Sequence, residues 1–542
     1  MRVKSILALA FSVVNISCFS QSWQWTKQIG SSSVMFDEFP TEVFCDGPSI
    51  YLIGAYGGKL LFPTDSLSSN GYNDSFIAKF EDNGSLVWIR TLGGASMSPS
   101  HIERSCGAFD TINHQLYLSG SIFGPTNFGN GINLTPSLLN NDAAFLAKFD
   151  SSGLCLWAKL FDSPGDDFAR CFLQPDGNIL VAGELDKDGL IDSQPIDSGG
   201  FFARFDPNGN LLWAEQKFMG PEVYPFGISF IGEDIIMTGY FNYNNSIIDT
   251  SYLALAGVIN GFLTRLDSLG HVKWIQTFDG PGINGSSGIC IDQFSNIYIT
   301  GGFQDSIQLG NLKLYDTDRD FFLAKFDDSG SAIWVAQGNC DGNIASGFKI
   351  VSDQDGNCIL IGSFSGNAQF GSFNVSASNQ TDMLIAKYNN STSACIGVRN
   401  FGLADGYALA VDNNRDIVCT GTFRNTINIG GTILSAYQGS DIFIAKSDEI
   451  VGLEEDRQFQ EKLVIYANPN RGTCTILVPD DLLNSKGLIL SVYDHKGEII
   501  QQTTVNINSE KISLNIDHEA NGIYRVKLGN RLKSYFGTII FE

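Results

Sequence analysis

The stretch Phe76-Ile77-Ala78-Lys79-Phe80-Glu81-Asp82-Asn83-Gly84, followed by Trp88, decides the fold because it recurs along the chain. Close copies begin at Phe145, Phe202, Phe262 and Phe322, and each carries a tryptophan ten residues after the Ala or Thr that precedes its basic residue. A sixth copy begins at Leu384 with Ile396 in the tryptophan slot, and a seventh at Phe443 has no tryptophan after it. We interpret each copy as two strands joined by a tight turn of the Asp-x-x-Gly kind.

A second signature, a short apolar strand ending in glycine, also occurs seven times. Its glycines are Gly54, Gly120, Gly183, Gly239, Gly301, Gly362 and Gly421, which lie 56 to 66 residues apart. Such a period suits one four-stranded antiparallel sheet per unit, the blade of a β-propeller. The sequence therefore predicts an all-β chain.

The phase of the repeat indicates how such a ring closes. Trp25 occupies a tryptophan slot without a preceding copy of the repeat strand, whereas the last copy, at Ala445 and Lys446, lacks its tryptophan strand. We therefore predict a seven-bladed β-propeller over residues 21–447, closed by an N-terminal outer strand.

The units resemble the SBBP-type bacterial β-propeller repeats, whose pattern runs D-x-x-G-N-x-Y-x-T-G and then D-x-F-x-A-K-F-D-x-x-G-x-x-x-W. The resemblance covers about residues 23–447. It implies the propeller fold and says little about function.

Residues 1–20 have the pattern of a signal peptide. Arg2 and Lys4 precede an apolar run from Ile6 to Ile16, and the segment closes on Cys18-Phe19-Ser20. The run is too short to span a bilayer, and no other stretch reaches transmembrane length. We expect Sec-dependent export and a mature chain without a transmembrane segment.

The C-terminal residues have the pattern of a second targeting segment. After a polar linker at 448–461, alternating runs over 462–542 predict a small β-sandwich. Its ordered motifs resemble the C-terminal type A sorting domain of the type IX secretion system of Bacteroidetes. The motif residues are Asn468, Pro469, Asn470, Gly472, Asp494, Gly497, Asn521, Gly522 and Tyr524. The resemblance implies the type IX machinery as a partner and a secreted or outer-membrane-surface location; the alternative is a carbohydrate-binding sandwich retained for function.

Composition and motifs exclude several functions. With 34 Lys and Arg against 58 Asp and Glu, the net charge of -24 argues against nucleic-acid binding. No histidines have metal-ligand spacing, and no nucleophile, zincin or P-loop motif is present. The dispersed cysteines are typical of small buried apolar residues, although one or two disulfides could form.

Two sets of charged residues remain as candidate sites. Every unit has a basic residue at one slot, which predicts either a ring for an anionic ligand or structural contacts between blades; we favour the second. Acids occur in the connections that lead into five of the seven units. They are Asp37, Glu103, Asp166, Glu222 and, one position later, Asp405. These acids either hydrogen-bond to loop backbone or form a carboxylate ring that binds a cation. The cofactor that such a ring would suit is Ca²⁺. Thermal shift on calcium titration tests this prediction, and no shift at millimolar Ca²⁺ rejects it.

The favoured function is a non-catalytic binding or adhesion module at the cell surface or in the medium, with a glycan or protein ligand. The alternative is a carbohydrate-active propeller enzyme, a glycosidase or lyase that uses paired axial carboxylates such as Glu103 with Asp166. A structural stalk without a small ligand is a third hypothesis.

Overall fold

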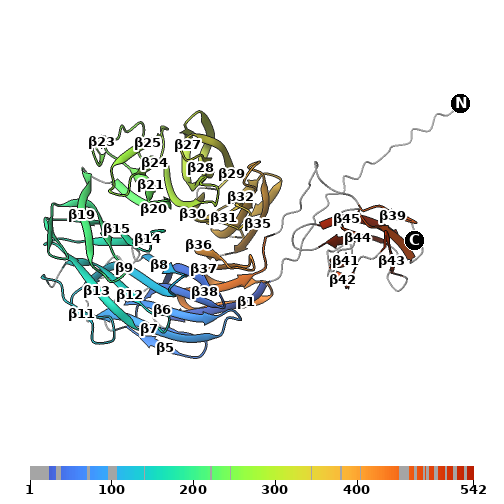
Figure 1. The fold of residues 1–542 in the computed structure, drawn as a ribbon, viewed down its shortest axis with the longest axis horizontal. Coiled ribbons are helices and arrows are strands. Elements are labelled where there is room, and N and C mark those ends of the chain that lie inside the picture. Colours follow the sequence, from blue (N-terminus) through green and yellow to red (C-terminus); the bar gives the residue numbers. More distant parts are fainter. Residues whose placement is uncertain are drawn as a thin grey trace. The chain divides into compact units, whose positions relative to one another are not determined.

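The computed structural model describes most of the chain from residue 23 onward. The described ranges are 23–31, 38–69, 74–94, 106–138, 141–219, 223–450 without 245, 343–344, 379–380 and 403, and then 463–468, 473–479, 482–483, 488–493, 499–506, 509–516, 522–529 and 534–541. Every named element in them is a β-strand (Figure 1). The chain divides into two compact units, Ser22–Leu453 and one that contains Glu454–Glu542. Within the described ranges, no helix is long and apolar enough to cross a membrane.

The larger unit contains seven sheets among its described residues, and each has a core of four antiparallel strands. Sheet 1 is β2 (Phe39–Asp46), β3 (Ser49–Tyr56), β6 (Asp74–Glu81) and β7 (Leu86–Gly94). Sheet 2 is β8 (Cys106–Asp110), β9 (Gln115–Phe123), β12 (Asp142–Phe149) and β13 (Cys155–Asp162). Sheet 3 is β14 (Phe168–Leu173), β15 (Ile179–Leu185), β18 (Gly199–Phe205) and β19 (Leu211–Met219).

The remaining four sheets follow the same order. Sheet 4 is β20 (Val223–Ile231), β21 (Asp234–Phe241), β24 (Asn260–Leu266) and β25 (Val272–Phe278). Sheet 5 is β26 (Gly285–Ile291), β27 (Ile297–Leu309), β28 (Leu312–Phe326) and β29 (Ala332–Cys340). Sheet 6 is β30 (Ala345–Ser352), β31 (Cys358–Phe364), β34 (Asp382–Tyr388) and β35 (Cys395–Gly402). Sheet 7 is β36 (Ala404–Val411), β37 (Ile417–Ile429), β38 (Thr432–Ser447) and β1 (Trp23–Ser31).

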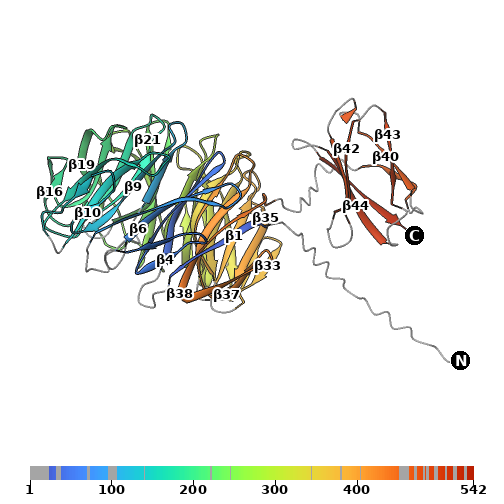
Figure 2. The same cartoon turned by 90° about the horizontal axis from the view of Figure 1, so that it is seen from below.

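The sheets are arranged around a common centre, with the first strands β8, β14, β20, β30 and β36 nearest to it (Figure 1). Figure 2 shows the same unit at right angles to this view, with neighbouring sheets standing side by side. The first strand of each sheet is therefore the one placed to line the centre.

Short hairpins link neighbouring sheets. Each leaves its own sheet between the second and third strands and pairs with the fourth strand of the preceding sheet. The hairpins and their partners are β4 (Lys59–Leu61) and β5 (Ser66–Ser68) on β1, β10 (Thr126–Asn127) and β11 (Asn133–Leu134) on β7, β16 (Gly189–Ile191) and β17 (Gln194–Ile196) on β13, β22 (Ile247–Ile248) and β23 (Ser251–Tyr252) on β19, and β32 (Asn367–Phe370) and β33 (Phe373–Ser376) on β29. They cover backbone edges that would otherwise be open to pairing with other chains.

The N-terminal strand pairs with strands from two different sheets. β1 pairs antiparallel with β38, with Trp25 opposite Lys446, and its other edge pairs with β4, which comes from sheet 1. Trp25 also donates a hydrogen bond from Nε1 to the carbonyl of Asp82 in sheet 1, at 2.8 Å. The first residues of the unit therefore lie between its last sheet and its first.

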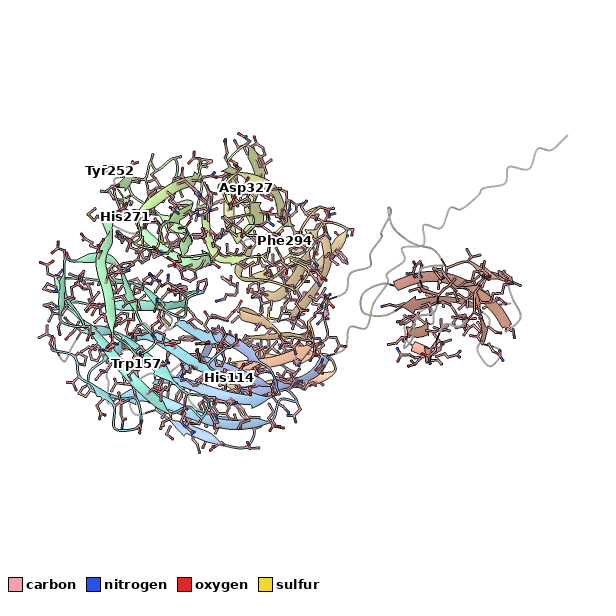
Figure 3. The ribbon with its side chains drawn as sticks, viewed as in Figure 1. His114, Trp157, Tyr252, His271, Phe294 and Asp327 are labelled. Carbon is pink, nitrogen blue, oxygen red and sulfur yellow. The ribbon has the colours of Figure 1, made fainter. Side chains whose placement is uncertain are left out.

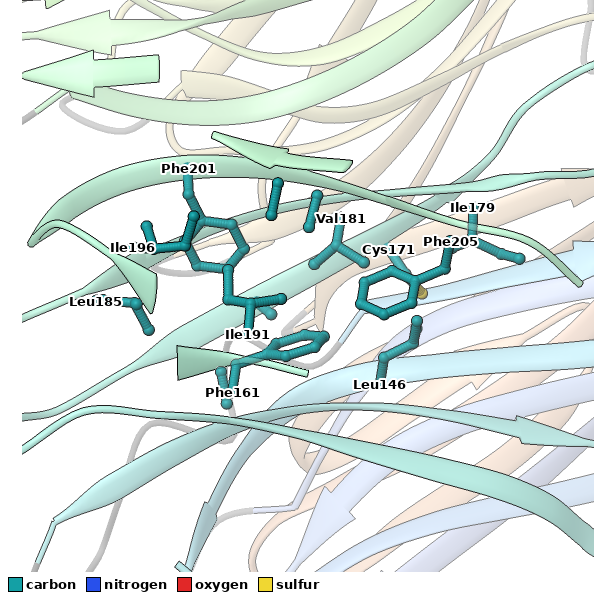
Figure 4. Close-up of a cluster of buried hydrophobic side chains, with 14 of the residues drawn as sticks. Leu146, Phe161, Cys171, Ile179, Val181, Leu185, Ile191, Ile196, Phe201 and Phe205 are labelled. Carbon is teal, nitrogen blue, oxygen red and sulfur yellow. The ribbon is translucent and has the colours of Figure 1, made fainter. Parts of the chain in front are cut away.

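The hydrophobic core lies between neighbouring sheets. One cluster buries Phe161 from sheet 2 against Phe201 and Phe205 from sheet 3, with the ring centroids of Phe161 and Phe205 5.6 Å apart (Figure 4). Each sheet has two apolar faces, so a single sheet could not bury both alone.

The repeated basic residue and tryptophan fasten one sheet to the next. Lys148 Nζ and Trp157 Nε1 both donate to the carbonyl of Pro207 in the turn of sheet 3, at 2.7 and 3.3 Å (Trp157 in Figure 3). The equivalent residues of sheet 5 donate to the corresponding turn of sheet 6. These contacts confirm the structural interpretation of the basic slot.

The turn that accepts these hydrogen bonds needs a glycine because the tryptophan of the preceding sheet packs against it. A Cβ on Gly209 would lie 2.9 Å from Cδ2 of Trp157, and the residue has φ +83. The other pairs are Gly84 with Trp25, Gly153 with Trp88, and Gly330 with Trp274. A left-handed backbone and a close aromatic ring both select glycine here.

The described residues of the C-terminal unit form two sheets. One has the order β39 (Ile465–Tyr466), β40 (Thr473–Leu477), β43 (Lys511–Asn515), and the other β42 (Ile499–Val505), β41 (Leu488–Tyr493), β44 (Gly522–Gly529), β45 (Ser534–Phe541). Residues from both sheets form one buried cluster, in which Ile476, Val492 and Val526 are fully buried. The two sheets therefore share one core.

Candidate functional site

Three of the five predicted acids, Asp37, Glu103 and Glu222, lie outside the described residues. Asp166 is exposed ahead of β14, where its Oδ1 accepts the N–H of Asp142 at 3.2 Å. Asp405 is exposed on β36. In the described part of the chain, no three His, Cys, Asp or Glu side chains gather as metal ligands would. The carboxylate ring stays a prediction.

The residue next to Asp166 shows what an acid in these connections does. The carboxylate of Asp167 is buried and accepts the backbone N–H and hydroxyl of Ser163, at 2.7 and 2.6 Å. It also accepts the N–H of Asp186, at 3.1 Å. Burial raises the pKa of Asp167 to about 6 although these hydrogen bonds lower it. Asp167 therefore fastens loop backbone.

A different set of residues lies on the first strands, nearest the common centre of the sheets. In each sheet one residue of the first strand pairs with, or lies opposite, the residue just before the repeat glycine. These residues are Glu42, Cys106, Arg170, Gly227, Gly288, Lys349 and Ala408. Charged side chains thus occupy equivalent places in sheets 1, 3 and 6.

Five of these first strands carry a bulge just before that place. The extra residues are Thr41, Phe226, Ser287, Phe348 and Tyr407. A β-bulge re-aims the side chain of its extra residue and is common beside binding and catalytic sites. Here it adds aromatic residues to the centre in sheets 4, 6 and 7.

The three charged residues act on one another across the centre. Lys349 Nζ lies 2.8 and 2.9 Å from the two carboxylate oxygens of Glu42, which belongs to a sheet that is not adjacent along the chain. Burial lowers the pKa of Lys349, but the Glu42 carboxylate and Cys106 together raise it by more, so the net shift is upward. Arg170 and Cys106 also act electrostatically on Lys349. The lysine is therefore a fixed cation at the centre.

Arg170 reaches across to the neighbouring sheet. Its guanidinium carbon lies 5.1 Å from the ring centroid of Phe226, and Nη1 donates to the Phe226 carbonyl at 3.1 Å. Phe226 in turn stacks on Tyr240, with centroids 5.3 Å apart and an interplanar angle of 22°. An aromatic platform holds the arginine in place.

Phe348, which directly precedes Lys349, and Tyr407 on β36 form a second aromatic surface. Their rings are stacked with centroids 6.5 Å apart and an interplanar angle of 15°. Each keeps about two fifths of its surface exposed, 40% for Phe348 and 42% for Tyr407. We call Glu42, Arg170, Lys349, Phe226, Phe348 and Tyr407 together the axial cluster.

The sequence contains a signal for this cluster, which is the nearly constant distance of its charged residues from the repeat glycines. Its charged members lie 12 to 13 residues before Gly54, Gly183 and Gly362, whereas Asp37 and Asp166 lie 17 residues before Gly54 and Gly183. Three units have a charged residue at this place. In two other units an aromatic residue, Phe226 or Tyr407, directly precedes the equivalent place.

The chemistry of the axial cluster suits binding. It offers guanidinium and ammonium donors, one carboxylate that is already paired, and flat apolar rings. General acid–base hydrolysis of a glycoside needs two carboxyl groups facing one substrate. Among the described residues, Glu42 is the one acid in this cluster.

Comparison with known proteins bears on the C-terminal unit first. Residues 464–542 match the family described as "Secretion system C-terminal sorting domain". The chain ends in a type IX sorting domain. Of its motif residues, Asn468 accepts the N–H of Ile540 through Oδ1 at 2.7 Å, Tyr524 is buried on β44, and Gly522 begins that strand. The other motif residues, Pro469, Asn470, Gly472, Asp494, Gly497 and Asn521, lie outside the described residues. The sorting domain supports export to the surface or medium.

The rest of the chain has distant relatives. It is 22% identical over 389 residues to the "Uncharacterized WD repeat-containing protein L264" of Acanthamoeba polyphaga mimivirus, a match that covers 56% of this chain and 27% of that protein. Solved structures with similar folds include the WD40 propeller domain of Doa1, with 9% identity, TM-score 0.40, and coverage of 80% and 98% of the two chains. Another is the Dos1 propeller, with 8% identity, TM-score 0.38, and coverage of 79% and 95%. A third is the phage phi92 endosialidase, with 10% identity, TM-score 0.34, and coverage of 96% and 86%.

Proposed function

We propose that this chain is an exported, non-catalytic binding protein that takes its ligand at the axial cluster of a closed seven-bladed propeller. In this proposal residues 1–20 are a signal peptide, 21–447 the propeller of SBBP-type repeats, 448–461 a linker and 462–542 the sorting sandwich. The repeats and the type IX tail suggest a bacterial source among the Bacteroidetes.

Ring closure is supported by the contacts of the last sheet with the first. Lys446 of sheet 7 is fully buried and bonds to Asp82 of sheet 1, and its Nζ lies 2.7 Å from Asp412. β1 completes sheet 7 as its fourth strand. These contacts repeat, at the seam, the fastening seen between sheets 2 and 3.

One observation carries the binding proposal: solvent-exposed aromatic rings and fixed charges meet on the first strands at the centre of the ring. Side chains that serve only packing would be buried here, since the neighbouring first strands contact one another. Phe348 and Tyr407 stay exposed instead.

The test is a screen of the full chain on immobilised polysaccharides and proteins, with analysis of released products for every binder. We expect retention of at least one polymer without new reducing ends or unsaturated products. Product release that stops on Glu42→Gln would favour the glycosidase or lyase alternative. No binder in either class would support the structural-stalk hypothesis.

A further inference from the structure

We propose that the axial cluster recognises the uronic-acid residues of an acidic polysaccharide. This inference rests on the proposed binding function and names its ligand class. It is carried by the charges and by the aromatic surface that lies beside them.

The net charge of the axial cluster is opposite in sign to the net charge of the chain. The chain has a net charge of -24, yet the described members of the cluster comprise two cations, Arg170 and Lys349, and one carboxylate, Glu42. A local positive potential inside an acidic protein draws a small anionic group while the remaining surface repels polyanions that do not fit. The cluster therefore favours a ligand whose negative charge enters the centre.

The donors suit a carboxylate. A guanidinium presents five N–H donors in a planar fork, and Arg170 is oriented by its contact with the ring and carbonyl of Phe226. The ammonium of Lys349 has three donors and is held by the two oxygens of Glu42. Both cations are fixed before a ligand arrives, so less conformational entropy is lost on binding.

The aromatic surface suits a sugar ring. Phe348 and Tyr407 are nearly parallel, with an interplanar angle of 15°, and both are exposed. The negatively charged face of an aromatic ring attracts the polarised C–H bonds on the apolar face of a pyranose. Phe348 directly precedes Lys349 on β30. In this proposal, a sugar ring lies on the aromatic surface and its carboxylate binds the ammonium.

A ligand that has both features on a single residue fits the cluster best. A neutral glycan has the flat face without the charge, and an acidic peptide has the charge without the flat face. A uronic acid combines them, since its carboxylate is attached directly to the pyranose.

The experiment is isothermal titration of the full chain with hexagalacturonate and with its fully methyl-esterified form, at about 20 mM and about 500 mM NaCl. We expect hexagalacturonate to bind at low salt, with affinity reduced about tenfold or more at high salt, and the ester to bind at least tenfold more weakly. Poly-glutamate, the acidic-peptide probe, should not bind.

Variants place the binding at the axial cluster. Arg170→Gln should weaken hexagalacturonate binding about tenfold or more, whereas Lys273→Gln, which removes a surface lysine paired with Asp234 on sheet 4, should leave it unchanged. If Arg170→Gln fails to fold, the double variant Lys349→Gln with Glu42→Gln removes the second cation together with its partner. Equal loss in Lys273→Gln would overturn the axial assignment.

The outcomes separate this inference from the proposed function. Ester and acid binding equally well, both lost in Tyr407→Ala, would leave the binding function standing and refute recognition of the uronate charge. Poly-glutamate binding as tightly as hexagalacturonate, or no binding of hexagalacturonate at all, also refutes the inference. The broader polysaccharide and protein screen then decides the function separately.

Discussion

At the scale of single residues, buried charges in this molecule fasten elements to one another. Asp320, in the third strand of sheet 5, is fully buried and accepts hydrogen bonds from Gln337 Nε2 at 2.5 Å and the N–H of Cys340 at 2.8 Å. Burial, followed by the neighbouring Asp316, raises the pKa of Asp320 to about 7. This carboxyl is therefore protonated more readily in the folded than in the unfolded state.

Asp320 makes stability depend on pH in a defined direction. Since its folded pKa exceeds an unfolded value of about 3.9, its contribution to stability is fully present below pH ~4 and is lost as the pH rises to about 7. Asp320→Asn should flatten the melting temperature between pH 5 and 8 and stabilise the fold at pH 8 by about 1 kcal/mol. Thermal melts at several pH values measure this. The exposed Asp328→Asn serves as control, and an unchanged slope in Asp320→Asn would refute the assignment.

Lys446 bonds to Asp412 in its own sheet 7 and to Asp82 in sheet 1. Burial lowers its pKa, but the hydrogen bonds and charges of Asp412 and Asp82 together raise it by more, so it stays charged. Lys446→Met leaves these carboxylates without their cation and should cost about 3–5 kcal/mol. Lys148→Met, which removes a bond to a single carbonyl, should cost only ~1 kcal/mol. Urea melts compare the two; equal losses would contradict a special role at the seam.

At the scale of elements, the repeated strands were predictable and the hairpins between them were not. The strand that holds Phe145, Ala147 and Lys148 and the turn before Trp157 follow from alternation and from Asp-x-x-Gly, both local signals. The hairpin β16–β17 comes from a connection of variable sequence, and its partner β13 lies in the preceding sheet. Such pairing is decided by tertiary contacts, which a single segment does not encode.

The axial cluster escaped prediction for a similar reason. Phe348 and Lys349 both face the exposed centre because a bulge breaks the two-residue alternation of β30. Alternation alone would place one of them toward the neighbouring sheet. The acids of the connections were easier to notice, yet the one best described, Asp167, fastens backbone.

Deleting residues 23–31 tests the role of β1. The strand pairs with β38 on one edge and β4 on the other, so its loss exposes two strand edges and unpacks Ile29, which is fully buried. We expect the melting temperature of the larger unit to fall by about 10 °C or more. Calorimetry measures this, and a transition within a degree of the parent would show that β1 is dispensable.

At the scale of the whole molecule, we expect the larger unit to bind the ligand and the sorting domain to direct export. The two compact units have separate cores, and the type IX sorting domain occupies residues 464–542. Truncation after residue 463 should retain the protein inside the outer membrane while leaving the melting transition of the ring unchanged. Cell fractionation and calorimetry read the two effects, and export of the truncated chain would contradict this division.

Paired aromatic substitutions on the first strands test whether the ligand binds at the axial cluster. Phe348→Ala with Tyr407→Ala removes the exposed stacked rings, whereas Phe294→Ala removes an exposed ring, 66% accessible, in a turn of sheet 5. With any polymer retained by the parent chain, affinity electrophoresis should show retention lost in the double variant and kept in Phe294→Ala. Retention unchanged in the double variant, with its melting temperature intact, would contradict the claim.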